Sequence, residues 1–385
     1  MPSSLRFLHA FPTFAIGGSQ VRFAQLANHF ARHGEQPIEH LIVAMDGRYQ
    51  CLSKLEPGVR HAEIEPPDGG PSMLGAIAAC RRTLKHQAPD LLLTYNWGAM
   101  DWSLANLALG LPEVHFEDGF GPDEAAGQLR RRILTRRLVL RWRAMTVLPS
   151  KVLLRHAETL WHLPSDRMVY IPNGIDCTRF TAGKDRADAG RTDDAVVIGT
   201  VAALRKEKNL GRLIEAFAAL ETSGNARLVI VGDGPERQSL EALSTSLGLG
   251  DRVRFAGHHD RPETVIADFD IFALSSDTEQ MPISVIEAMA AGLPVAAVDV
   301  GDVREMVAEV NRPHIVPAEA NALSRTIALL IDDRDLRTRL GEANRIRAET
   351  AFDEGLMVQC YAALFREVMG QSPAAAPIYP IEGAP

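Results

Sequence analysis

Two carboxylates, Glu279 and Glu287, are separated by seven residues in a segment whose pattern places both of them near a helix start. The run 271–274 just before them is continuously apolar, which is typical of a buried parallel strand. From Ile283 onward, apolar residues recur with a helical period, and Gly292 ends the predicted helix. Glu279 is therefore expected between the carboxyl end of a strand and the start of a helix, where open α/β sheets bind ligands.

The start of this helix, at Met281, Pro282 and Ile283, has the features of an anion site. Proline suits a first helical turn, and the N–H groups of that turn favour an anion such as a diphosphate. Glu287 lies one to two turns further on, where its carboxylate can accept hydrogen bonds from ribose hydroxyls. The alternative is an ordinary strand–helix–strand unit that carries two surface glutamates.

Positive charge that could hold a diphosphate occurs in the segment 199–209, which follows a predicted strand and precedes a predicted helix. A diphosphate leaving group carries negative charge, so its departure requires cations held nearby. Lys208 and Arg205 are the candidates, and Lys206 lies in the same turn. The alternative is a solvated, charged turn without a ligand.

The segment 275–294 resembles the nucleotide-sugar site of retaining glycosyltransferases of family 4, also called group 1, which have the two-Rossmann-domain (GT-B) architecture. The resemblance covers nearly the whole chain and includes three further segments, 171–176, 231–236 and 253–258. It implies a metal-independent, cofactor-free hexosyltransferase. Such an enzyme moves a hexose or hexose derivative from a nucleoside-diphosphate sugar to a glycan, lipid-linked or small-molecule acceptor, with retention of the anomeric configuration.

The resemblance also assigns roles in the C-terminal half. It implies that Glu279 is a catalytic residue that holds the hydroxyls of the transferred sugar. It also implies that Glu287 holds the ribose. Lys208 corresponds to the lysine that holds the donor phosphates in similar enzymes. The arginine that accompanies this lysine corresponds to Ala203 here, and Arg205 is the candidate to replace it.

In the N-terminal half, the resemblance points to His115 as a catalytic residue that faces the donor sugar from the opposite domain, so that the site is complete only when the domains close. Glu117 and Asp118 follow it and could bind acceptor hydroxyls or act as a base. Gly17 and Gly18, between the first strand and its helix, are expected to let the backbone approach the diphosphate. The alternatives are a satisfied histidine in a glycine-rich loop and a simple Gly-Gly turn.

Strand and helix patterns alternate in two series, which predicts an α/β fold of two Rossmann-like domains that face each other across a cleft. The expected order is an N-terminal acceptor-side domain over residues 1–180, a nucleotide-sugar-binding domain over 181–355, a C-terminal helix over 356–370 that returns to the N-terminal domain, and a disordered tail over 371–385. A polar stretch, 181–194, is interpreted as the linker.

The composition of the chain argues against several classes of protein. The net charge of −8 and the pI near 5.9 argue against a general nucleic-acid binder. The 4 cysteines are scattered without a Cys-x-x-Cys pair, which fits a reducing cytosol and argues against a zinc site or a disulfide framework. We recognise no signal peptide, and no stretch approaches the roughly 20 apolar residues of a membrane span. These features predict a cytoplasmic protein.

The stretch 130–143 is rich in arginine and interleaves these residues with apolar ones and Trp142. An amphipathic, arginine-rich helix is typical of membrane-surface binders, with an attraction to anionic lipid of about 1 kcal/mol for each basic residue at the surface. This pattern would place the protein peripherally on the inner face of the membrane. The alternative is a helix that packs by its apolar stripe and leaves its arginines in water.

Two rival classes share many of these features. One is a nucleotide-sugar epimerase on the same scaffold, and the other is a membrane-docked binding module that has lost activity through Ala203. A dehydrogenase is disfavoured because the chain has no Gly-x-Gly-x-x-Gly fingerprint.

Overall fold

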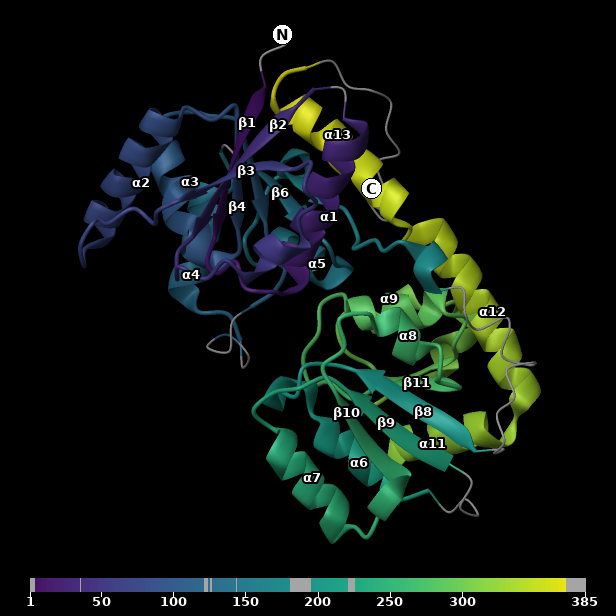
Figure 1. The fold of residues 1–385 in the computed structure, drawn as a ribbon. Coiled ribbons are helices and arrows are strands. Elements are labelled where there is room, and N and C mark those ends of the chain that lie inside the picture. Colours follow the sequence, from purple (N-terminus) through teal and green to yellow (C-terminus); the bar gives the residue numbers. More distant parts are fainter. Residues whose placement is uncertain are drawn as a thin grey trace. The chain divides into compact units, whose positions relative to one another are not determined.

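The computed structural model describes residues 4–34, 36–120, 124, 127–142, 144–180, 195–220 and 226–371, and the chain divides into two compact units (Figure 1). Unit 1 contains residues 1–172 together with 357–385, and unit 2 contains residues 173–356. The predicted linker over 181–194 lies outside the described residues, as does the predicted tail beyond Gln371.

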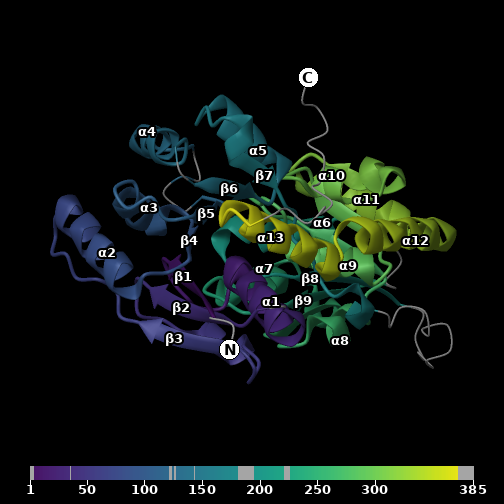
Figure 2. The ribbon, with the colours of Figure 1, turned by 90° about the horizontal axis from the view of Figure 1, so that it is seen from above.

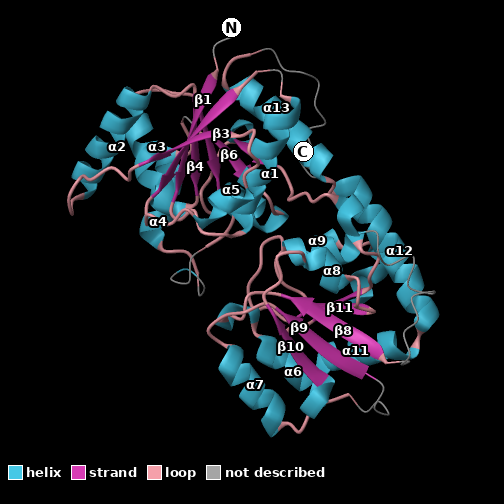
Figure 3. Ribbon diagram, viewed as in Figure 1, coloured by secondary structure: helices cyan, strands magenta, loops and turns pink. Residues whose placement is uncertain are grey.

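Unit 1 is built on a parallel sheet, whose strands are drawn in magenta in Figure 3. In the described part of the chain this sheet has seven strands in the order β3-β2-β1-β4-β5-β6-β7. The strands are β1 (Leu5–Phe11), β2 (Ile38–Ala44), β3 (Arg60–Ile64), β4 (Leu91–Tyr95), β5 (Glu113–Phe116), β6 (Met145–Leu148) and β7 (Met168–Tyr170). The helices are α1 (Gly18–His33), α2 (Met73–Gln87), α3 (Met100–Asn106), α4 (Arg130–Val139), α5 (Lys151–Thr159) and, from Met357 onward, α13 (Glu354–Val368).

Alternate residues along the strands of unit 1 point to opposite faces of its sheet. On β1, Phe7 and Phe11 pack in the core with α1 and α13, whereas Leu8 and Ala10 pack in the core with α2 and α3. Figure 2 shows the two groups of helices on the two sides of the sheet. A parallel sheet that is covered on both faces requires this continuously apolar strand pattern. Because α13 packs against the N-terminal sheet, the predicted return of the C-terminal helix is confirmed.

Unit 2 is built on a second parallel sheet, with six strands among the described residues, in the order β10-β9-β8-β11-β12-β13. The strands are β8 (Val196–Val201), β9 (Ala226–Val231), β10 (Val253–Gly257), β11 (Ile271–Leu274), β12 (Val295–Val298) and β13 (Ile315–Val316). The helices are α6 (Leu210–Ala218), α7 (Arg237–Ser246), α8 (Pro262–Ile266), α9 (Ile283–Ala290), α10 (Val303–Met306), α11 (Ala320–Asp332) and α12 (Arg334–Ala351).

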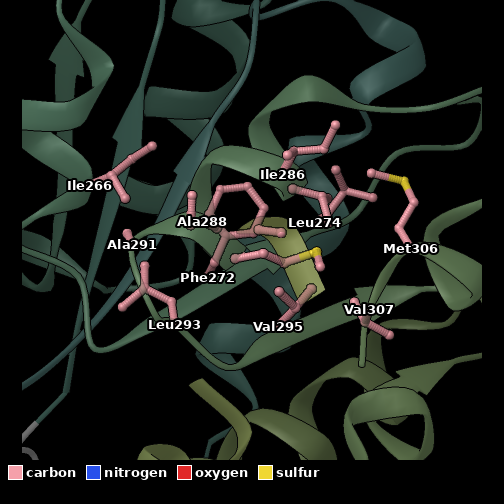
Figure 4. Close-up of a cluster of buried hydrophobic side chains, with 14 of the residues drawn as sticks. Ile266, Phe272, Leu274, Ile286, Ala288, Ala291, Leu293, Val295, Met306 and Val307 are labelled. Atoms are coloured by element: carbon pink, nitrogen blue, oxygen red, sulfur yellow. The ribbon is translucent and has the colours of Figure 1, made fainter. Parts of the chain in front are cut away.

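The core of unit 2 fixes the short helix α9 firmly against the sheet. Figure 4 shows Phe272 and Leu274 of β11 together with Ile286 of α9 and Val295 of β12, and all four are buried in one cluster. Full burial of such side chains stabilises the fold by roughly 1.5–3 kcal/mol each. The two elements that flank Glu279, β11 and α9, are therefore held rigidly.

The boundary between the units lies before the predicted one. The structure enters unit 2 at Asn173, eight residues before the expected start at 181. The reason is that Ile175 bonds to the end of α12, donating to the backbone oxygen of Phe352 at 2.9 Å and accepting from the backbone N–H of Glu354 at 2.8 Å. Ile175, Cys177 and Phe180 are then buried in the core of unit 2.

No helix among the described residues combines the length and the apolar character that crossing a bilayer requires.

Candidate functional site

Lys208 and Glu279 form an ion pair at the carboxyl edge of the unit 2 sheet. Nζ of Lys208 lies 2.7 Å from Oε1 of Glu279, and the two side chains are 25% and 10% exposed. Lys208 follows β8 and Glu279 follows β11, and these strands pair in parallel at the point where the strand order reverses. Such a switch point is the usual ligand position of an open α/β sheet. The structure thus brings together two residues that the sequence predicted for one site.

A polar framework holds the two loops in register. Ser276 donates from Oγ to Oε1 of Glu279 at 2.7 Å, and Ser275 donates from Oγ to the backbone oxygen of Lys208 at 3.2 Å. Arg212 donates to the backbone oxygen of Ser275 at 2.7 Å and to the Asp277 carboxylate at 2.6 Å. Sequence reasoning gave no role to Ser276, although it lies within the segment 275–294, and it missed Arg212, which belongs to no recognisable motif.

The turn after β9 supports the backbone of the loop after β8. Gly232 has φ +133°, and a Cβ there would lie 1.9 Å from the backbone oxygen of Ala202. The backbone N–H of Leu204 donates to the Asp233 oxygen at 3.0 Å. The segment 231–236 therefore acts as a structural turn that buttresses the Lys208 loop, and glycine is required where the two backbones touch.

Gly301, in the loop after β12, touches the backbone that carries Glu279. Its φ is +56°, and a Cβ would lie 2.5 Å from the Glu279 oxygen and 2.6 Å from the Gln280 oxygen. No local sequence pattern indicates this contact, because Gly301 follows Glu279 by more than twenty residues.

A valine at Gly301 is expected to displace the Glu279 loop. The strained backbone conformation and the collision with two carbonyl groups should together destabilise unit 2 by about 2–4 kcal/mol. Nucleotide binding should weaken in parallel. Thermal melts with and without nucleotide check this, and Gly248→Val is the matched control, since Gly248 also has a positive φ but no atom within 4 Å of the place a Cβ would take. If the two valine variants behave alike, backbone strain alone explains the loss and the contact is unimportant.

Glu287 lies on α9 in a charged neighbourhood. Burial raises the pKa of its carboxyl to about 7, an effect opposed by the positive charge of Arg179 and reinforced by the negative charge of Glu263. Arg179 itself forms an ion pair with Glu263 at 2.9 Å. The segment 171–180 thus supplies a cation near the carboxylate that was predicted to hold the ribose.

Nucleotide affinity is expected to rise with pH through a contribution from Glu287. Only the ionised carboxylate can accept from both ribose hydroxyls, and with a pKa of about 7 its ionised fraction rises roughly tenfold between pH 6 and pH 8. Titrations of a nucleoside diphosphate against the wild type and Glu287→Gln measure the effect. The titration of the nucleotide phosphates is common to both proteins, so the difference isolates Glu287. Parallel pH profiles of the two proteins would rule out this role.

The other residues of unit 2 that were predicted to contact the donor lie at the same edge of the sheet, and their contacts differ from one residue to the next. Pro282 is the residue just before α9, one position earlier than predicted, and Met281 is buried with its backbone oxygen accepting from Asn173 Nδ2 at 3.2 Å. Ile283 begins the helix. Arg205 is exposed, and its side chain has no ion pair or hydrogen bond among the described residues, so the structure does not bring it to Glu279.

His115 is the last residue but one of β5 in unit 1 and is completely buried. Its Nδ1 lies 2.8 Å from Oγ1 of Thr94, and its Nε2 lies 3.7 Å from the Glu117 carboxylate. Within the described residues, Nε2 has no hydrogen-bond partner. The ring is thus fixed through one nitrogen, while the other remains available for a bond that these contacts do not supply.

Glu117 and Asp118 are both engaged within unit 1, so this geometry does not support the expectation that they bind acceptor hydroxyls. Glu117 is completely buried and accepts from Nε of Arg136 at 2.9 Å. Asp118 forms an ion pair with the buried Arg22 at 2.6 Å. The buried Glu117 carboxylate and the buried Arg22 guanidinium would each be strongly unfavourable without an oppositely charged partner, so both ion pairs stabilise unit 1.

Two arginines of the arginine-rich helix are buried, which neither interpretation of its sequence expected. Arg132 and Arg136 turn inward, where both bond to Glu124 and stack over Trp97 at 4.9 and 5.4 Å. The remaining described arginines of the stretch are exposed, as are Leu134 and Leu138, at 56% each. Arg143, the last residue of the predicted helix, lies outside the described residues. The helix is therefore packed partly through buried ion pairs.

Gly17 and Gly18 lie at the carboxyl edge of the unit 1 sheet, after β1. Gly17 has an extended backbone with φ −164°, and Gly18 is the first residue of α1. The conformation of Gly17 is open to any residue, so the structure gives no backbone reason for glycine there.

Comparison with known proteins finds two family matches along the chain. Residues 16–179 match the family described as Glycosyltransferase Family 4, and residues 182–347 match the family described as Glycosyl transferases group 1. The two matches are consecutive and fall largely on unit 1 and unit 2, respectively.

Individual relatives agree with the family matches. The chain is 29% identical to the lipopolysaccharide core biosynthesis glycosyltransferase LpsE of Rhizobium meliloti, over 54% of this chain and 61% of that protein. It is 35% identical to the 2-deoxystreptamine glucosyltransferase of Streptomyces kanamyceticus, over 42% of this chain and 45% of that protein. The chain thus spans about half the length of the curated relatives it matches.

Solved structures share the fold over nearly the whole chain. Anabaena HepE, solved in complex with UDP and glucose, superposes with a TM-score of 0.75 over 94% of this chain and 100% of that one, at 19% identity. WaaG, a glycosyltransferase involved in lipopolysaccharide biosynthesis, gives a TM-score of 0.70 over 94% of this chain and 99% of that one, at 17% identity. The fold and the two consecutive family matches together confirm the resemblance seen in the sequence: the chain belongs to the group 1, family 4 glycosyltransferases with the GT-B architecture.

Proposed function

We propose that this chain is a retaining, metal-independent hexosyltransferase that takes a hexose or hexose derivative from a nucleoside-diphosphate sugar. Its acceptor is a glycan, a lipid-linked molecule or a small molecule. The observation that carries the proposal is the Lys208–Glu279 pair at the switch point of unit 2, where a cation for phosphates and a carboxylate for sugar hydroxyls lie 2.7 Å apart. The relatives named above, which are glycosyltransferases, support the same activity.

Each donor group has a candidate partner in unit 2. Lys208 and the N–H groups at the start of α9 would neutralise the diphosphate as it departs. In enzymes generally, removing one group that stabilises developing negative charge lowers kcat by about 10²–10³. Glu279 would hold the sugar hydroxyls, and Glu287 the ribose. Arg205 is exposed on the Lys208 loop and would add a second cation only if its side chain turns toward the phosphates.

The experiment is a melting-temperature screen with UDP, GDP and their sugars, followed by product analysis. A ligand that binds only the folded protein raises its melting temperature by mass action. We expect UDP or GDP to stabilise the protein and Glu287→Ala to remove the effect. Slow hydrolysis or transfer of the sugar that is lost in Glu279→Ala supports a transferase, whereas release of an epimerised nucleotide sugar would point to the epimerase. No response to any nucleotide would overturn the proposal.

In unit 1, we propose His115 as the group that assists at the donor sugar, acting through Nε2. This nitrogen is aimed toward the Glu117 carboxylate and has no hydrogen-bond partner among the described residues. An imidazole in this state can donate to a hydroxyl or stabilise developing positive charge through its dipole. The role requires the ring to become accessible during turnover. His115→Ala should then lower kcat while leaving the affinity for a nucleoside diphosphate unchanged, because the nucleotide is held by unit 2.

The exposed face of α4 suits a lipid-linked acceptor at an anionic membrane surface. On α4, Leu134 and Leu138 lie about one helical turn apart and are each 56% exposed, and Trp142, in the turn that follows the helix, is 67% exposed. Arg137 on α4 and Arg141 in the following turn are also exposed, and the Arg141 guanidinium lies 6.0 Å from the centroid of the Trp142 ring. Apolar side chains that enter the interface together with arginines that meet anionic headgroups are the two components of interfacial binding. We therefore include peripheral attachment to the inner face of the membrane in the proposal.

Replacing Leu134 and Leu138 by serine is expected to reduce binding to vesicles that contain anionic lipid by about thirtyfold, since each lost leucine removes roughly 1 kcal/mol of interfacial burial. Co-sedimentation with vesicles of phosphatidylglycerol and phosphatidylcholine measures it. Leu329→Ser with Ile346→Ser in unit 2 is the matched control, because those side chains are 60% and 62% exposed. Equal binding by all three proteins would remove α4 from the proposal.

A further inference from the structure

The Lys208–Glu279 pair poses a problem for the donor site, because each partner is also the proposed ligand of a different part of the donor. The 2.7 Å contact occupies the same Nζ that would meet the diphosphate and the same carboxylate that would meet the sugar. Both side chains are largely buried, at 25% and 10% exposure, so solvent screens their attraction less than at an open surface. Any diphosphate that engages Lys208 must therefore compete with Glu279.

We propose that this ion pair makes the site discriminate between the loaded nucleotide sugar and the spent nucleoside diphosphate; the inference rests on the proposed function. With a nucleotide sugar, the sugar hydroxyls replace Lys208 as partners of Glu279, and the phosphates replace Glu279 as partners of Lys208. Both groups are then satisfied at once. With a nucleoside diphosphate alone, Glu279 has no sugar to bind, returns to Lys208 and competes with the phosphates.

The competition favours release of the product. Transfer removes the sugar from Glu279, and its carboxylate then weakens the hold of Lys208 on the leaving nucleotide. A ligand changes such an equilibrium only by its differential interaction with the two arrangements, and the sugar provides that difference here. The pair therefore couples sugar occupancy to phosphate affinity without any movement of the backbone.

Ser276 is the residue that keeps the carboxylate in place during this exchange. Its hydroxyl donates at 2.7 Å to Oε1 of Glu279, the same oxygen that Lys208 contacts, and the serine is 2% exposed. A buried serine with this bond fixes the position of the carboxylate whichever second partner it has. We assign Ser276 as a positioning residue for Glu279.

The test measures dissociation constants of UDP, GDP and their glucose or mannose derivatives by calorimetry. Glu279→Gln should bind whichever nucleoside diphosphate binds the wild type about tenfold more tightly, and should lose most of the preference for the sugar form. Glu207→Gln is the matched control. Glu207 is exposed on the same turn, and its carboxylate has no ion pair among the described residues. That variant removes one negative charge without touching the pair, and its affinity should change less than about twofold.

The outcomes separate the explanations. An unchanged or weaker affinity in Glu279→Gln overturns the inference, and so does an equal gain in Glu207→Gln, because a general loss of repulsion would then suffice. A wild type that binds no nucleotide contradicts the proposed function itself. For Ser276, alanine should weaken binding of the sugar form about fivefold relative to the free diphosphate, and threonine should restore it. Equal weakening of both ligands, or no rescue by threonine, would remove the positioning role.

Discussion

Replacing Lys208 by methionine is expected to lower kcat by about 10²–10³ and to weaken binding of a nucleoside diphosphate. The change removes the cation beside the departing phosphates and leaves the Glu279 carboxylate, 2.7 Å from the former Nζ position, facing the anion without its partner. Repulsion therefore adds to the lost attraction. Steady-state kinetics with a sugar donor and calorimetry with the free diphosphate measure the two effects separately.

Lys206→Met is the matched control for this prediction. Lys206 belongs to the same turn, carries the same charge and is exposed, with no ion pair among the described residues. We expect its kinetics to lie within about twofold of the wild type, because exposed charges contribute little. Comparable losses in both lysine variants would mean that the turn acts by overall charge and that Lys208 has no specific place in the site.

Replacing Arg136 by methionine is expected to destabilise unit 1 by about 3–5 kcal/mol, since removal of one partner of a buried ion pair leaves uncompensated buried charge. Arg136 is completely buried between Glu117, at 2.9 Å, and Glu124, at 3.3 Å. Its guanidinium also stacks over the rings of Trp97 and Trp161 at 5.4 and 5.1 Å. Methionine fills part of this space but neutralises neither carboxylate.

Denaturant unfolding followed by tryptophan fluorescence measures this loss in unit 1 specifically. All 4 tryptophans of the chain lie at positions 97, 102, 142 and 161, within unit 1. Combining Arg136→Met with Glu117→Gln and Glu124→Gln should recover much of the stability, because the buried charges disappear together. A single variant that unfolds within about 1 kcal/mol of the wild type would show that the buried carboxylates do not depend on Arg136.

The sequence predicted the parts of the site that are local. The apolar run before Glu279, the period of α9 and the stop at Gly292 are each encoded within a few residues, and the structure has β11, α9 and a positive φ at Gly292 in these places. The Lys208–Glu279 contact was harder to predict, because the two residues are 71 positions apart in the sequence. It follows only once β8 and β11 are known to be neighbours, which the family resemblance supplied and the residue pattern did not.

The parts that could not be predicted depend on long-range packing. Arginines in a run normally point to water, so nothing in the sequence indicated that Arg132 and Arg136 would be buried with Glu124. Likewise, no local sequence pattern predicts the contact between Gly301 and the Glu279 backbone. The unit boundary at Asn173 follows from the pairing of Ile175 with Asp353, which lie at opposite ends of unit 2 in the sequence.

Hydrogen–deuterium exchange with and without a nucleoside diphosphate tests most directly where the donor docks. We predict slower exchange in two segments of unit 2, residues 204–209 and 276–287, upon addition of UDP or GDP, and no such change in Lys208→Met. These are the loops after β8 and β11 together with the first turns of α9. Slower exchange confined to other parts of the chain, with these two segments unaffected, would contradict a donor site at this edge of unit 2.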